Sequence, residues 1–188
     1  DYSSAMLERC RNLTGAQARQ ILNSHHQPEE ALGHWVAVVR ELFEEVGILL
    51  CVDEAGAPFA PSDAAVERRI EQQRRAIANK QLDFIDFLIA EKLFCDLAQA
   101  VYFDHWVTPE IYSMRFDTRF YVAALPADQS PLASSEEVTH SIWLKPAEAL
   151  ARMDRRDFPI LPPTTTVLSA LSRMPTWQHL AAQFKLPR

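Results

Sequence analysis

Three glutamates lie close together in segment 40–48, which reads Arg-Glu-Leu-Phe-Glu-Glu-Val-Gly-Ile, and they are the strongest chemical signal in the chain. A helix turns by about 100° per residue, so Glu41, Glu44 and Glu45 fall on one face at positions i, i+3 and i+4. Each like-charge pair at this spacing costs roughly 0.2–0.5 kcal/mol. Arg40 lies four residues before Glu44 and can neutralise one charge, so two remain.

A bound divalent cation would offset that remaining charge. Mg²⁺ and Mn²⁺ prefer oxygen ligands, and carboxylates supply them. Such an ion can bridge phosphate oxygens and activate a water molecule as a nucleophile. The plain alternative is a solvated, charged helix face with no ion, and three glutamates alone favour that alternative.

The order of residues in segment 40–48 changes this balance. It resembles the second half of the Nudix box, R-E-U-x-E-E-x-G-U with U apolar, at every fixed position. In the first half of the box, Leu32 and His26 stand where the family pattern has Glu and Gly. The resemblance therefore implies either a degenerate site or a box that is split by an insertion.

A split box is a feature of the Nudix branch that includes the peroxisomal coenzyme A diphosphatases and their bacterial relatives. Residues 105–109 (His-Trp-Val-Thr-Pro) and 114–120 (Met-Arg-Phe-Asp-Thr-Arg-Phe) resemble its W-x-T-P and R-F-D-T-x-F segments. The glutamate pair at 136–137 and the Leu-Pro-Pro-Thr at 161–164 follow in the expected order. The resemblance covers about residues 28–173, and it implies that the family's glycine-rich segment and first strands precede Asp1.

Three charged residues near the start of a predicted strand form a second candidate site. Arg115 could bind a phosphate through two parallel hydrogen bonds, as arginine often does. Asp117 fits better in an Arg–Asp ion pair that braces the loop against the strand, and Arg119 lies two residues after it. For Arg115 the two interpretations are equally supported.

The remaining candidates are weaker. Glu136 and Glu137 precede an apolar strand, where a Nudix glutamate can act as general base or extra metal ligand, although a solvated loop is the plainer reading. Trp106 could stack on an adenine, but a core indole is more common. His25 and His26 have no further ligand at metal-site spacing, so we expect a surface loop.

Composition excludes several other functions. The net charge of −6 and the pI of about 5.5 argue against a duplex nucleic-acid binder. The three cysteines (Cys10, Cys51 and Cys95) are widely spaced, which argues against a disulfide framework or zinc site and favours a reducing compartment. No run reaches the roughly 18 to 20 apolar residues of a membrane span. No signal peptide and no peroxisomal Ser-Lys-Leu ending is found, so we expect a cytoplasmic location.

The elements that must position these residues follow from hydrophobic period, caps and breakers. Thr14 is expected to cap a helix, Pro28 to begin the glutamate-bearing helix, and Gly47 to end it. Helices are expected within 2–24 and at about 28–46, 63–79, 81–98, 145–153 and from 164 onward. Strands are expected at about 48–52, 100–107, 119–125 and 141–144.

This mixture of elements predicts an α/β or α+β fold. The resemblance implies one Nudix α/β/α sandwich over residues 1–188, with a mixed sheet and a helical insertion at 62–100. It also implies a Mg²⁺- or Mn²⁺-dependent hydrolase in which Glu41, Glu44 and Glu45 bind the metal and Arg40 orients them. Glu137 would complete the catalytic set, and Arg115, Trp106 and Glu136 would contact substrate.

The implied substrate is coenzyme A or an acyl-coenzyme A, cleaved at its pyrophosphate. Two alternatives stay open: hydrolysis of ADP-ribose, a nucleotide sugar or a dinucleotide, and a non-catalytic Nudix-fold binding module. A helical interaction domain is a weaker third alternative. The expected partner is a small phosphoanhydride compound, with neither nucleic acid nor membrane, and a homodimer is left open.

Overall fold

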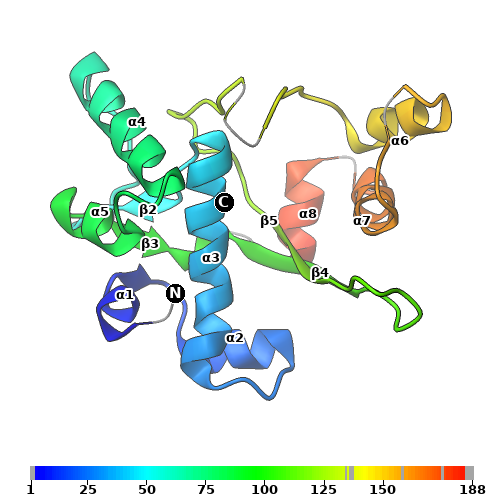
Figure 1. Cartoon of the computed structure of the whole chain (residues 1–188), viewed down its shortest axis with the longest axis horizontal. Coiled ribbons are helices and arrows are strands. Elements are labelled where there is room, and N and C mark those ends of the chain that lie inside the picture. Colours follow the sequence, from blue (N-terminus) through cyan, green and yellow to red (C-terminus); the bar gives the residue numbers. More distant parts are fainter. Residues whose placement is uncertain (1–2, 134, 136–137, 158, 175, 185–188) are drawn as a thin grey trace. The chain divides into compact units, whose positions relative to one another are not determined.

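The computed structural model divides the chain into two compact units, each of which is described by itself (Figure 1). The first unit comprises Asp1–Ala100 and Ala123–Ser141, and the second comprises Val101–Val122 and Ile142–Arg188. The structure describes residues 3–133, 135, 138–157, 159–174 and 176–184.

The first unit packs helices against a small sheet. Its helices are α1 (Ser4–Glu8), α2 (Gly15–Leu22), α3 (Pro28–Val46), α4 (Ala64–Ala78), α5 (Phe84–Ala90) and the short 3₁₀ helix η1 (Leu97–Gln99). Its strands are β1 (Cys10–Arg11), β2 (Cys51–Val52) and β3 (Phe94–Asp96).

Helix α3 is the longest helix of this unit, and its ends lie where the sequence predicts. Pro28 stands in its first turn, and the Glu30 side chain accepts a hydrogen bond from the backbone N–H of Gln27 at 3.2 Å. Gly47 ends it with a φ of +75°, a left-handed conformation that glycine adopts without strain. The buried residues of α3 lie along one stripe: Ala31, Leu32, Gly33, Trp35, Val36, Val39 and Phe43.

Three cysteines lie in register across the three-stranded sheet, whose strand order is β1-β3-β2. Cys95 on β3 pairs with Cys10 on the parallel strand β1 and with Cys51 on the antiparallel strand β2. All three are free thiols, and Cys51 and Cys95 are fully buried. Burial, followed by the neighbouring Cys95, raises the pKa of Cys10 to about 12. The hydrogen bond with Cys51, followed by burial, raises the pKa of Cys95 well above its usual value.

The helix predicted at 81–98 is wrong. Only α5 (Phe84–Ala90) is α-helical there, and β3 follows it. The chain turns at Lys92, whose φ of +55° lies in the left-handed region. Leu93-Phe94-Cys95 is a short continuous apolar run, so it shows no alternation that could separate a strand from a helix. The final part of the segment 62–100 therefore holds a strand.

The second unit combines a hairpin with helices. Strands β4 (Val101–Val107) and β5 (Asp117–Val122) form an antiparallel pair, and the helices are α6 (Pro146–Asp154), α7 (Pro162–Ser172) and α8 (Trp177–Phe184). The strand predicted at 141–144 is wrong, because these residues lie in no strand. Ile142 and Trp143 are 51% and 76% exposed, so this apolar run is not held against a sheet.

The fold is thus a mixed α/β structure with small mixed sheets, as the sequence predicts. Among the residues that the structure describes, no helix is both long enough and apolar enough to cross a membrane.

Candidate functional site

Arg40 joins two of the three candidate metal ligands on α3. Its Nη1 donates to Glu44 Oε1 at 2.5 Å, and its Nη2 donates to Glu41 Oε1. The Glu44 side chain is 16% exposed, whereas the Glu41 side chain is 48% exposed. One guanidinium therefore holds a shielded carboxylate and an open carboxylate at the same place on the helix, as the i, i+4 spacing of Arg40 and Glu44 predicts.

The negative charge of this cluster raises the pKa of Arg40. Burial alone lowers the pKa of its guanidinium, but the hydrogen bond to Glu44 and the charges of Glu41 and Glu44 outweigh burial and raise it. Glu45 follows Glu44 on the same turn and is half-buried. With one arginine and three carboxylates, the formal charge of the four side chains is −2.

The donor set of this cluster fits a hard divalent cation. Within the described residues, no three His, Cys, Asp or Glu side chains converge closely enough to form a ready-made metal cage. Mg²⁺ rarely uses such a cage, since it usually binds one or two carboxylates together with waters and substrate phosphates. Glu41, Glu44 and Glu45 supply hard oxygen ligands and a net negative charge, so the residues present match what such an ion requires.

The C-terminal end of α3 is held by partners outside the helix. The last carbonyls of a helix have no partner within it and must find one elsewhere. The N–H of Gly47 donates to the Phe43 carbonyl at 2.9 Å, and the N–H of Leu132 donates to the Val46 carbonyl at 2.9 Å. The Glu44 carbonyl accepts a hydrogen bond from Arg74 Nη1. Neighbouring elements therefore fix the turn that carries Glu44 and Glu45.

Arg74 was not among the residues singled out in the sequence. It is 5% exposed and is held by Glu71, with Nε to Oε2 at 2.7 Å and Nη2 to Oε1 at 2.9 Å. A signal was present: Arg74 lies four residues after Ile70 and three before Ile77, on the buried stripe of α4. An arginine on an apolar stripe needs a buried partner, but the stripe does not say which one.

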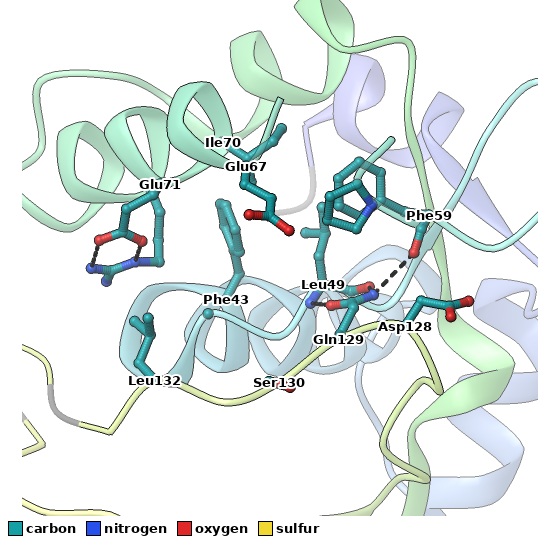
Figure 2. Close-up of a pocket in the computed structure, with 13 residues that line it drawn as sticks. Phe43, Leu49, Phe59, Glu67, Ile70, Glu71, Asp128, Gln129, Ser130 and Leu132 are labelled. Carbon is teal, nitrogen blue, oxygen red and sulfur yellow. Dashed lines mark hydrogen bonds and ion pairs between the residues drawn. The ribbon is translucent and has the colours of Figure 1, made fainter. Parts of the chain in front are cut away.

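A cavity of about 340 Å³ lies beside this end of α3. Figure 2 shows Phe43, Leu132 and the α4 residues Glu67 and Ile70 around it, and the paired dashed lines at Glu71 mark its contact with Arg74. None of the three candidate metal ligands lines this cavity.

Gln129 closes one side of the cavity. Its side-chain oxygen accepts from the backbone N–H of Leu49 at 2.8 Å, and its Nε2 donates to the carbonyls of Leu49 and Phe59 at 3.0 and 3.2 Å. Figure 2 shows these contacts as dashed lines. The segment that carries Leu132 is thereby fixed against the chain that follows α3.

Replacing Gly47 with alanine is expected to destabilise the first unit by about 2 kcal/mol, because an alanine in the left-handed region costs roughly 1–2 kcal/mol. An added Cβ would also lie 3.0 Å from Leu132 Cγ. Urea unfolding measures the loss. Gly56→Ala is the matched control, since Gly56 has a φ of +85° with no atom within 4 Å of the added Cβ. Equal losses in both variants would show that Leu132 does not crowd position 47.

The charged candidates of the second unit are bound to one another or to backbone. Asp117 Oδ1 lies 2.6 Å from His105 Nε2 and 2.8 Å from Arg119 Nη1, so Asp117 forms an Arg–Asp pair as expected, and its partner is Arg119. Arg115 Nε donates to the Thr108 carbonyl at 3.0 Å, and its side chain is 45% exposed. Trp106 on β4 is half-buried.

The other candidates are the two histidines before α3 and the glutamate pair at 136–137. His26 Nδ1 lies 3.5 Å from Glu30 Oε2, and its ring packs edge-on against His34. His25 is exposed between α2 and α3. Glu136 and Glu137 lie outside the described residues. The structure thus brings Arg40, Glu41 and Glu44 together, and the roles of all the candidate site residues stay predictions.

Comparison with known proteins gives concordant matches. The family model described as the NUDT19 Nudix domain matches residues 7–173. The acyl-coenzyme A diphosphatase NUDT19 of Xenopus laevis is 28% identical over 145 residues, which is 72% of this chain and 38% of that protein's length. The crystal structure of a Nudix hydrolase from Alicyclobacillus acidocaldarius is similar, with a TM-score of 0.66 at 27% identity, covering 85% of this chain and 68% of that one.

Proposed function

Because the chain belongs to the NUDT19-type Nudix domains, we propose that it is a divalent-metal-dependent hydrolase of a phosphoanhydride compound. The observation that carries this proposal is the cluster on α3, in which one arginine binds two of three neighbouring carboxylates. These residues occupy the fixed positions of the Nudix box. A solvated helix face would need neither that order of residues nor the partial burial of Glu44.

In the proposed mechanism, Glu41, Glu44 and Glu45 would hold Mg²⁺ or Mn²⁺, and Arg40 fixes the direction of the Glu41 and Glu44 carboxylates. The ion, when bound, supplies the positive charge that draws phosphate oxygens and water to this turn of the helix. Water adds to one phosphorus, the bridging P–O bond breaks, and the proton of the water passes to a carboxylate. Glu137 is the proposed acceptor of that proton, and Glu136, Arg115 and Trp106 are the proposed substrate contacts.

We propose coenzyme A or an acyl-coenzyme A as the substrate, released as a phosphopantetheine and an adenosine bisphosphate. The similarity to a protein named acyl-coenzyme A diphosphatase supports this choice. So do the segments at 105–109 and 114–120, which frame the β4–β5 turn. The proposed overall organisation is one Nudix domain over residues 1–188, with a split box whose second half is segment 40–48 and a separate helical insertion at 62–100.

A panel of substrates tests the proposal. The purified chain is incubated with coenzyme A, an acyl-coenzyme A, ADP-ribose, a nucleotide sugar and a dinucleotide, with Mg²⁺ or Mn²⁺, and the products are identified by mass. We expect turnover of the coenzyme A compounds, reduced to background by EDTA and restored by Mn²⁺, since the carboxylates need the cation to bind phosphate.

The two alternatives predict other results. Turnover of ADP-ribose with none of coenzyme A would replace the proposed substrate but keep the hydrolase. Binding of these compounds with no product from any of them, at saturating metal, would favour the non-catalytic binding module.

A further inference from the structure

We propose that Arg74 is a positioning residue of the metal site, through which helix α4 fixes the turn of α3 that carries Glu44 and Glu45. This inference rests on the proposed function. Arg74 donates to the backbone carbonyl of Glu44. It would act by fixing where the metal ligands stand.

The contacts of Arg74 are those of a brace between two helices. Two of its nitrogens bind both oxygens of Glu71 on α4, at 2.7 and 2.9 Å, and a third donates to Glu44 on α3. The planar guanidinium presents these donors in a fixed fork. Since the Glu71 carboxylate anchors one side of that plane, the direction of the donor that meets the Glu44 carbonyl is also set.

The electrostatics favour the same arrangement. A cation near the C-terminal end of a helix stabilises the exposed carbonyls, and the end of α3 has no basic residue of its own in its last turn. The hydrogen bond from Arg74 is the first of the causes that lower the pKa of Glu71, so the pair remains ionised at neutral pH. Burial keeps solvent from weakening the contact, because Arg74 is 5% exposed.

Glu44 is consequently held at two points. Arg40 binds its carboxylate from within α3, and Arg74 binds its carbonyl from α4. Glu45 follows directly, so any change in the backbone at position 44 moves both proposed ligands. Groups that orient metal ligands typically change metal affinity or activity by about 10- to 100-fold when they are removed.

Arg75 provides a matched control. It lies on the same helix and binds the same partner, with Nε 2.7 Å from Glu71 Oε1. Its side chain is 67% exposed, and the ion pair that it forms stays within α4. Arg75→Met therefore removes an equal charge and a Glu71 contact but leaves the Glu44 carbonyl bonded.

The experiment compares wild type with Arg74→Met, Arg74→Lys and Arg75→Met. Mn²⁺ affinity is measured by electron paramagnetic resonance without substrate, and backbone exchange at residues 45–47 by hydrogen–deuterium exchange. We expect both Arg74 variants to bind Mn²⁺ about tenfold more weakly and to exchange faster at 45–47, with Arg75→Met close to wild type. Lysine at position 74 is not expected to restore Mn²⁺ affinity, because one ammonium group cannot make the three separate hydrogen bonds of the guanidinium.

The variant Arg74→Lys keeps the buried charge. It therefore still tests the effect of the guanidinium on Mn²⁺ affinity if Arg74→Met does not fold. Equal Mn²⁺ affinity in the Arg74 variants and Arg75→Met would overturn the role of Arg74. A wild-type protein that binds no Mn²⁺ would instead remove the proposed metal site. That result is distinct, since faster exchange at 45–47 would still separate Arg74→Met from Arg75→Met.

Discussion

Replacing Glu44 with glutamine is expected to lower the turnover of the proposed substrate by at least about a hundredfold. Glutamine keeps the size of the side chain but removes the charge that a cation needs and that Arg40 binds at 2.5 Å. Initial rates at saturating Mg²⁺, together with Mn²⁺ affinity, measure the effect. Both should fall together, because the carboxylate acts by holding the ion.

Glu29→Gln is the matched control for this change. Glu29 is an exposed glutamate in the first turn of the same helix, so the variant removes the same charge at the other end of α3. We expect its turnover and Mn²⁺ affinity to match wild type. A Glu44→Gln protein that keeps turnover within about twofold of the control would exclude the Glu44 carboxylate from the metal site.

Replacing Trp35 with alanine is expected to cost about 4 kcal/mol of the free energy of unfolding. Trp35 is 2% exposed, and its indole N–H donates to the Ala100 carbonyl at 2.7 Å. The substitution leaves a cavity beneath α3 and also leaves that carbonyl without its partner. Urea unfolding followed by circular dichroism gives the difference.

An exposed tryptophan separates this effect from a general effect of losing an indole. Trp143 is 76% exposed, so Trp143→Ala should change the free energy of unfolding by no more than about 0.5 kcal/mol. If both variants lost the same stability, the packing of Trp35 under α3 would not be what stabilises the first unit.

Local signals predicted the helix that carries the candidate site. Thr14 caps α2 with its side chain, as the sequence indicated, and the Gln17 side chain accepts a hydrogen bond from the Thr14 backbone N–H. Pro28 and Gly47 mark the ends of α3, because a fixed φ suits a first turn and a positive φ suits a cap. The pairing of Arg40 with Glu44 followed from their spacing alone.

Features that depend on distant residues could not be predicted in this way. Arg74 meets the Glu44 carbonyl across 30 positions of sequence, and no local pattern specifies that encounter. Within 81–98, the continuous apolar residues 93–95 show no alternation, so the sequence pattern does not distinguish β3 from the end of a helix. At 141–144, apolar residues indicated a strand, but strand formation also needs a neighbour to pair with.

The three cysteines across the small sheet are expected to react slowly with alkylating agents while the protein is folded. Thiol reagents attack the thiolate, and the raised pKa values of Cys10, mainly from burial, and of Cys95, mainly from its hydrogen bond with Cys51, keep both thiols protonated at neutral pH. Modification at Cys51 and Cys95 must therefore wait until β2 and β3 separate. The rate of alkylation at these two residues therefore measures how often β2 and β3 separate.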